Sequence, residues 1–460
     1  MAADITSRHA ELRANYSAQL AELAAWAESQ QLSVEAETSR NWLPALQPNR
    51  LMLACRPAAG EVVSKLPETA SEWRQRFATL RRGQAEALFA LAKAAATSGH
   101  ASVAFQILPE VIRENPDHEK ARAILGYEKY EGRWLTPFEV AKARDGQTWH
   151  ANFGWLPADH VPRYEAGERL FGTRWVDAED DQTLRSAPRK GWDIVTEHYN
   201  VHSSHSLEEG VRLATRLERL YDAWQQIFAG FTATEPILAR RFAGHGAKRS
   251  VPMQHKVVYF RSRDEYVRAL EKDEPQIGIS TGFYLANKRE AYFYADEATA
   301  GDDSNLYHEA THQLFSEIKH SVRDIGQDAN FWIVEGIACY MESLTESDGW
   351  HFLGGNDAAR LRDAQHRLLV DDYYVPLAEL TGYGMERLQR DPNIPMLYSE
   401  SSGLTYFLMH GERARYRDAL IAYLSAIYQG RARPTTLAEL CGAKDTVLDA
   451  QYRAFLKGLK

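Results

Sequence analysis

Cysteine is scarce in this sequence, and its scarcity excludes two ways of stabilising a fold. The 460 residues contain three cysteines, at Cys55, Cys339 and Cys441. Because they are odd in number and far apart, they provide neither a disulfide framework nor a Cys-x-x-Cys zinc knuckle. Cys339 lies in an apolar stretch and is expected to act as a small buried hydrophobic residue.

Long apolar runs are also missing. No stretch of about 18 uninterrupted apolar residues occurs, so we expect no membrane span. The start of the chain, Met1–Asp4, lacks the basic region and apolar core of a secretory signal. Two compartments stay open: the cytoplasm, or export of a mature form whose leader has been replaced by Met1.

Positive charge is not in excess. The chain has 54 Lys and Arg against 63 Asp and Glu, a formal net charge of −9. A nucleic-acid partner demands clustered basic residues, so no nucleic acid is expected as a partner. With 44% hydrophobic and 25% charged residues, the composition is that of an ordinary globular protein, long enough for two or three domains.

The most informative pattern that the sequence does contain is His308-Glu309-Ala310-Thr311-His312. On a helix of about 3.6 residues per turn, positions four apart share one face, so His308 and His312 can converge on one metal ion. Neutral imidazoles suit Zn²⁺, which lowers the pKa of a bound water to about 7. Glu309 would be the general base for that water. The alternative is a solvated helix with two surface histidines.

A third ligand is expected from Glu335, the one carboxylate in the apolar stretch from Phe331 to Met341. A buried carboxylate is costly unless it is paired or metal-bound, and His, His, Glu is one attested zinc ligand set. Alternatively, Glu335 is a first-turn acid of a helix that starts near Asn330.

These residues together with the segment Trp332-x-x-Glu335-Gly336 resemble the gluzincin branch of the zinc metallopeptidases, and most closely an uncharacterised bacterial peptidase-like family. The resemblance covers about residues 190–410. It implies one Zn²⁺ per chain, held by His308, His312 and Glu335, with Glu309 as general base. The interval to Glu335 is slightly longer than in the best-studied members. A Gly-x-Met-Glu-Asn exopeptidase signature is missing, which favours an endopeptidase over an aminopeptidase.

Further site residues follow from the same chemistry. A hydrolase that forms an oxyanion gains from a hydrogen-bond donor aimed at it, and related gluzincins use a Tyr or His downstream of the third ligand. Tyr398 is similar in position, and Tyr383 is a second candidate. Glu342 is a candidate partner for a metal-binding histidine. The isolated histidines are interpreted as surface or satisfied core groups; they are His351, His366 and His410.

The expected fold class is α+β, mostly helical. Residues 1–145 are predicted to form a helical domain, in which a helix pair at about 70–127 resembles a tetratricopeptide unit. Residues 146–190 show no clear periodicity and are predicted to be a linker. Residues 191–460 are predicted to form a zincin-like catalytic domain with a small mixed sheet. A hairpin at 282–294 precedes the His308 helix. The resemblance to gluzincins implies that it borders the substrate cleft, and the alternative is an ordinary sheet edge.

Three functions follow as hypotheses. The first is a zinc peptidase acting on a peptide or protein substrate. The second is a non-catalytic, zinc-containing binding or scaffold protein, whose N-terminal helices recruit a protein partner. The third is a zinc hydrolase for a non-peptide amide. A base beside the metal favours an enzyme, because structural zinc needs no base and is usually closed by a fourth protein ligand.

Overall fold

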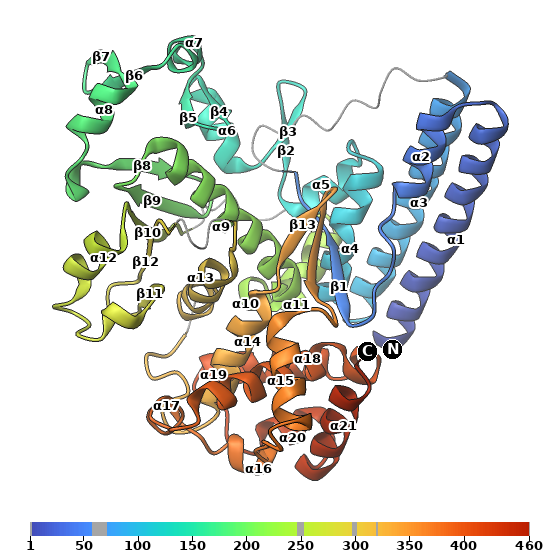
Figure 1. Ribbon diagram of the computed structural model, residues 1–460. Coiled ribbons are helices and arrows are strands. Elements are labelled where there is room, and N and C mark those ends of the chain that lie inside the picture. The colour runs from blue at the N-terminus through green and yellow to red at the C-terminus, as the bar shows by residue number, and fades with distance from the viewer. Residues whose placement is uncertain (1, 58–70, 246–252, 297–300, 319–320, 460) are drawn as a thin grey trace.

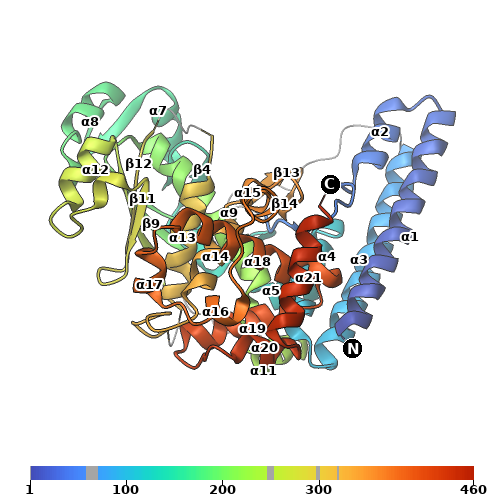
Figure 2. The same ribbon diagram turned by 60° about the horizontal axis from the view of Figure 1, so that its bottom comes forward.

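The structure is a computed structural model that describes residues 2–57, 71–245, 253–296, 301–318 and 321–459. The fold is α+β and mostly helical, as the sequence predicts. Figures 1 and 2 both show the long N-terminal helices at one side of the molecule. The main sheet and a set of small hairpins lie at the opposite side, with many of the C-terminal helices between. Within the described residues, no helix has the length and apolar character needed to span a membrane.

The N-terminal layer is built from three helices, α1 (Ala2–Ser29), α2 (Ser33–Asn41) and α3 (Ser71–Thr97). Its core contains fully buried aromatic side chains: Trp73 and Phe77 stack with ring centroids 4.7 Å apart. Tyr16 of α1 is also buried and donates a hydrogen bond to Glu114. The layer is therefore joined to the next helix of the chain through both apolar and polar contacts.

The predicted helix pair is formed by α3 and α4 (Ala101–Glu114), followed by α5 (Glu119–Leu125). Leu88, Leu108 and Leu238 belong to one apolar cluster, which includes residues of α10 (Ala229–Thr232) and α11 (Glu235–Phe242). Glu235 accepts hydrogen bonds from backbone N–H groups at the start of α4, where a negative charge is favourable. The N-terminal helices therefore pack directly on the second half of the chain.

The segment 146–190, in which the sequence shows no clear periodicity, consists of two hairpins and short helices. Arg163 lies 3.9 Å from the ring centroid of Trp175, and Trp149 and Trp155 face each other across the first hairpin. Strands of four residues are too short to show periodicity in sequence, which explains why none is visible there. The elements are β4 (Gln147–His150), β5 (Gly154–Pro157), η1 (Ala158–His160), α7 (Val161–Glu165), β6 (Glu168–Phe171), β7 (Arg174–Asp177), α8 (Ala178–Leu184) and η2 (Pro188–Lys190). They follow β2 (Glu128–Tyr130), β3 (Arg133–Leu135) and α6 (Pro137–Arg144).

A mixed five-stranded sheet, in the order β11-β12-β10-β9-β8, forms the centre of the second half. The two inner pairs are parallel and the two outer pairs are antiparallel. The sequence predicts one strand at 192–201, whereas the structure divides it into two paired strands. The predicted hairpin is confirmed, with Tyr284 opposite Ala291. The strands are β8 (Trp192–Val195), β9 (Tyr199–Ser203), β10 (His255–Phe260), β11 (Gly282–Leu285) and β12 (Glu290–Tyr294).

Helices cover this sheet and continue to the C-terminus. Helix α9 (Leu207–Ile227) begins at Ser206, whose hydroxyl accepts a hydrogen bond from the Glu209 backbone N–H, as expected for an N-cap. Its residues Leu217 and Trp224 share one core with the sheet. The other helices are α12 (Arg263–Leu270), η3 (Ile277–Ile279), α13 (Ser304–Ser316), α14 (Phe331–Met341), α15 (Ala359–Leu369), α16 (Leu377–Leu380), α17 (Met385–Gln389), α18 (Ile394–Ala414), α19 (Arg417–Tyr428), α20 (Thr436–Cys441) and α21 (Asp445–Lys457).

A second sheet, in the order β1-β14-β13, joins the two ends of the sequence. Strand β1 (Arg50–Ala54) pairs with β14 (Trp350–Gly354), which also pairs with β13 (Thr345–Ser347). Figure 1 shows β1 from the N-terminal part of the chain lying against strands of the C-terminal part. The N-terminal region therefore contributes a strand to a sheet whose other members lie about 300 residues later in the sequence.

Candidate metal centre

Two consecutive helices carry the predicted metal ligands. Helix α13 buries Leu306, Ala310 and Leu314, which recur every four residues and face the core. His308 and His312 lie on the adjacent face of the same helix, one turn apart. The helix after it, α14, is buried along its whole length and presents Glu335 to both histidines. The apolar character of α14 therefore brings a carboxylate into the interior, where it needs a partner.

The ligand atoms of His308, His312 and Glu335 converge on one point. The two Nε2 atoms lie 3.2 Å apart, and Glu335 Oε2 lies 3.4 Å from Nε2 of His308 and 3.6 Å from Nε2 of His312. Tetrahedral zinc with bonds of about 2.0–2.2 Å requires its ligand atoms to be about 3.3–3.6 Å apart. The three side chains therefore form a group that can hold a metal ion.

The pKa values of Glu335 and His308 are shifted by burial and by the charged groups around them. Burial favours a protonated Glu335, but the charge of His312 and hydrogen bonds from both histidines hold the pKa of Glu335 well below its usual range. Burial opposes protonation of His308, but hydrogen bonds with Cys339, Glu335 and Glu342 raise the pKa of His308 well above its ordinary value. A metal ion would have to displace a proton from His308, which makes metal affinity dependent on pH.

Glu342 orients His308, which confirms the contact predicted for it. Its Oε1 lies 2.8 Å from Nδ1 of His308, so Nε2 is the nitrogen left for a metal. Arg360 donates two hydrogen bonds to the Glu342 carboxylate, at 2.8 and 3.0 Å. Nothing in the sequence pattern distinguishes Arg360, because it is 18 residues away on α15. The buried thiol of Cys339 also hydrogen-bonds to His308, so its surroundings are more polar than the sequence suggests.

Glu309 lies beside the ligand group rather than in it. The Tyr284 backbone N–H of β11 donates a hydrogen bond to Glu309 Oε2 at 3.1 Å, which fixes the carboxylate between the sheet edge and the histidines. Burial raises the pKa of Glu309, and the charges of His308 and His312 offset part of this rise. A carboxylate whose pKa is raised is a better proton acceptor.

The two candidate tyrosines occupy different places. The Tyr398 hydroxyl, on α18, hydrogen-bonds to Glu335, and burial together with the charge of Glu335 raises the pKa of Tyr398. The Tyr383 hydroxyl instead donates to Glu379 at 2.8 Å. Of these two tyrosines, the structure brings only Tyr398 into contact with the ligand group.

The three isolated histidines differ from one another. His410 is buried and satisfied by the Tyr340 hydroxyl at 3.0 Å, whereas His366 has a side chain that is 58% exposed. These two match the expected core and surface interpretations. His351 is buried, and one of its ring nitrogens bonds to Asp222 while the other has no hydrogen-bond partner among the described residues.

Comparison with known proteins adds one match. Residues 302–431 match the model of a family described as a protein of unknown function, DUF1570. The matched segment contains all the predicted site residues, which are His308, Glu309, His312, Glu335 and Tyr398. No curated protein matches the sequence.

Proposed function

We propose that this chain is a zinc-dependent peptidase of the gluzincin type, more an endopeptidase than an aminopeptidase, with a zincin-like domain and an N-terminal domain that includes a tetratricopeptide-like helix pair. The observation that carries the proposal is the convergence of His308, His312 and Glu335 at 3.2–3.6 Å from one another, with Glu309 adjacent. This donor set, of two imidazoles and one carboxylate, is typical of a catalytic zinc that keeps one position open.

In the proposed mechanism, the metal and the side chains have separate catalytic roles. Zinc, when bound, supplies Lewis acidity and lowers the pKa of water. Glu309 takes the proton from the attacking water and returns it to the leaving amine, as a general base and then a general acid. The Tyr398 hydroxyl donates a hydrogen bond to the substrate oxygen on which negative charge develops.

Strand β11 supports a peptide as the substrate. It is the terminal strand of its sheet, and its Tyr284 N–H points to Glu309 rather than to the neighbouring strand. An extended peptide can pair with such an edge through main-chain hydrogen bonds. The scissile bond would then lie next to the base.

The alternative is a non-catalytic protein in which zinc is structural and the N-terminal helices bind a protein partner. It differs from the peptidase in needing neither Glu309 nor an open metal position. A zinc hydrolase for a non-peptide amide would keep both features and differ only in its substrate.

Hydrolysis of a peptide library by the native chain and by Glu309→Gln tests the proposal. Glu309→Gln should keep the metal content of the native chain and lose about 10²–10⁴-fold in rate. Glu317→Gln is the matched control, because Glu317 lies two turns further along α13 and pairs with His255 instead. Native activity in Glu309→Gln would contradict the mechanism, and zinc binding without cleavage of any peptide would favour the binding protein.

Tyrosine substitutions test the second role. Tyr398→Phe should lower kcat by about 10²–10³-fold, the effect of losing one oxyanion donor. Tyr383→Phe should leave kcat unchanged, since its hydroxyl bonds to Glu379. Equal losses in both variants would show that the effect comes from packing.

A further inference from the structure

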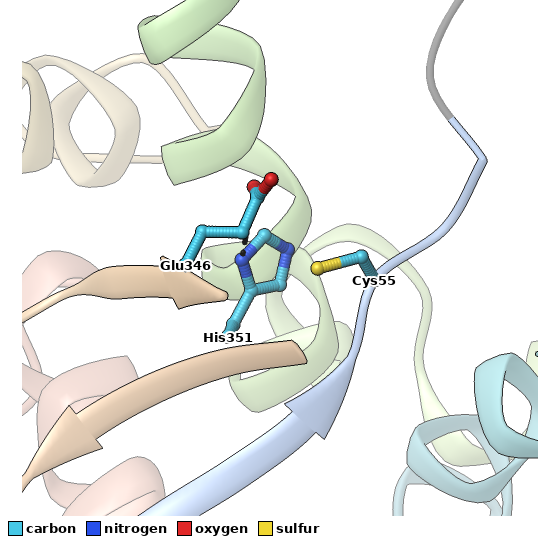
Figure 3. Close-up of side chains that lie close together, drawn as sticks. All are labelled: Cys55, Glu346 and His351. Carbon is cyan, nitrogen blue, oxygen red and sulfur yellow. Dashed lines mark ion pairs between the residues drawn. The ribbon is translucent and has the colours of Figure 1, made fainter. Parts of the chain in front are cut away.

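The three-stranded sheet places a second set of ligand-type residues on one face. Glu346 of β13 lies directly opposite His351 of β14. On the other side, His351 lies opposite Leu53 of β1, and Cys55 follows Leu53 by two residues. Because side chains alternate along a strand, Cys55 lies on the same face as Leu53, diagonal to His351. Three strands therefore bring a thiol, an imidazole and a carboxylate together (Figure 3).

These groups are close enough to share a metal ion. The cysteine sulfur, one ring nitrogen of His351 and a carboxylate oxygen of Glu346 all lie within 4.8 Å of one another. Nδ1 of His351 is 3.7 Å from Glu346 Oε2, close to the separation that a tetrahedral zinc ion imposes on two of its ligands.

The ring of His351 is oriented by Asp222 on α9. Asp222 accepts hydrogen bonds from the Arg56 backbone N–H and from its side chain, and Gln226 donates a further one. It therefore acts as an acceptor for His351 as well, and Nε2 of His351, at 2.9 Å, is the donor. A neutral imidazole with a proton on Nε2 has its lone pair on Nδ1.

That lone pair is buried without a hydrogen bond. His351 is 1% exposed, and its Nδ1 has no hydrogen-bond partner among the described residues. Leaving such an atom unpaired is costly, so its position points to a ligand. A carboxylate that holds the far nitrogen of a histidine is also the usual companion of a metal-binding imidazole.

The surroundings allow a metal ion to reach the group. Cys55 lines a cavity of about 1190 Å³, together with Arg113, Ser347 and Trp350. Arg219 lies 3.2 Å from Glu346 Oε2, which holds the carboxylate in place.

We propose that Cys55, His351 and Glu346 bind a second metal ion, separate from the group at His308. A sulfur, a nitrogen and an oxygen ligand suit Zn²⁺ or its spectroscopic substitute Co²⁺. The bound ion would link β1 to the β13–β14 hairpin and would stabilise the native state, because the unfolded chain lacks the site.

Co²⁺ titration of the full chain tests this proposal without any measurement of activity. The native chain should bind two ions, and binding at the second site should produce thiolate-to-cobalt charge-transfer absorption. Cys55→Ser should bind one ion fewer and lose that absorption. Cys339→Ser is the matched control, because Cys339 lies beside His308, and it should retain the absorption.

Two further variants separate this site from the other one. The double variant His308→Ala and His312→Ala should keep the charge-transfer absorption, whatever the fate of the peptidase proposal. It should also lose one ion if the group at His308 binds metal. Glu346→Gln, whose side chain is 31% exposed, should weaken cobalt binding without unfolding the protein. The proposal is overturned if Cys55→Ser binds as many ions as the native chain, or if the absorption disappears in Cys339→Ser instead.

Discussion

The group at His308 and the group at His351 place similar chemistry on different scaffolds. The helix group, His308, His312 and Glu335, lies on two consecutive helices, and its members are at most 27 residues apart in sequence. The strand group consists of Glu346 on β13, His351 on β14 and Cys55 directly after β1, and it spans almost 300 residues. A helix delivers two ligands by its own periodicity, whereas each strand delivers one ligand and needs its neighbours for the rest.

Both groups nevertheless orient their histidine in the same way. In the helix group, Nδ1 of His308 contacts Glu342, which is held by Arg360. In the strand group, Nε2 of His351 contacts Asp222, which is held by Arg56. In both groups a histidine contacts a carboxylate that is paired with an arginine. The ring nitrogen left for a metal is Nε2 in His308 and Nδ1 in His351. A carboxylate that is paired with an arginine therefore orients the histidine in each group.

The largest expected contrast between the two regions is in how stability depends on pH. It arises from one buried carboxyl group in each region, Asp222 and Glu400. Burial tends to raise the pKa of Asp222, but the charge of Arg56 and the hydrogen bond from His351 hold it below its usual range. For Glu400 on α18, burial and the charge of Asp449 raise the pKa to about 8. In the unfolded chain Glu400 ionises at a lower pH than in the native state. Its contribution therefore destabilises the native state increasingly as pH rises from about 4.3 to about 8.

Glu400→Gln should remove this penalty. The variant should gain about 3–5 kcal/mol in unfolding free energy over the native chain at pH 9, and almost nothing at pH 4. Urea denaturation across this range measures the difference. Glu386→Gln, whose side chain is 64% exposed, is the control and should show no such trend. A constant difference at all pH values would contradict the assigned shift.

One carboxylate from each group provides a second test. Glu342→Gln should weaken zinc binding at the helix group by about 10–100-fold, because His308 loses a charged partner. Glu346→Gln should leave that group unchanged and weaken only the strand group. Competition with a chromophoric zinc chelator measures both affinities. An equal loss at the helix group in the two variants would mean that the groups are coupled rather than separate.

A glycine at a helix crossing tests how the helix group is held. A Cβ added at Gly336 would lie 2.6 Å from the Ser401 carbonyl oxygen, so Gly336→Ala should force α14 away from α18. The expected cost is about 1–3 kcal/mol of stability, with a loss of the contact between Glu335 and Tyr398. Gly83→Ala, in a helix where the added Cβ meets nothing within 4 Å, should instead stabilise by about 0.5–1 kcal/mol. Thermal unfolding of both variants gives the comparison.

The smallest effect is expected in the hairpin that carries the strand group. Gly349 has a φ of +75° in the turn between β13 and β14, and its carbonyl accepts a hydrogen bond from Cys55. Gly349→Ala should cost about 1 kcal/mol, because alanine is strained in this conformation. It should weaken Co²⁺ binding by the strand group and leave the helix group intact. Gly278→Ala, at ordinary φ with open space, should change neither property.

Much of the helix group could be predicted from residue order. The spacing of His308 and His312 and the isolated charge of Glu335 in an apolar helix indicate three residues that the structure brings together. The partner role of Glu342 was also predictable, because it follows Glu335 by two helical turns. The hairpin that contains Tyr284 was recognisable from its two short apolar strands and polar turn. These features depend on contacts within one hairpin, within one helix or between two consecutive helices.

Other features could not be predicted in this way. Segment 146–190 appears irregular because each of its strands has only four residues. Sequence reasoning names both Tyr398 and Tyr383 as candidates, and only packing distinguishes them, because the position of α18 against α14 brings one hydroxyl to Glu335. The contact of Arg360 with Glu342 could not be predicted either, because no local sequence pattern marks Arg360.

The sequence by itself determined where metal ligands could share one helix face, because the periodicity of the α-helix acts over four residues. It also determined the mostly helical α+β class. Only the tertiary structure decided that Cys55 meets His351 and Glu346, and that His351 keeps one buried nitrogen without a hydrogen bond. Pairing between β1 and β14 depends on the folding of almost 300 intervening residues, and no local spacing encodes it.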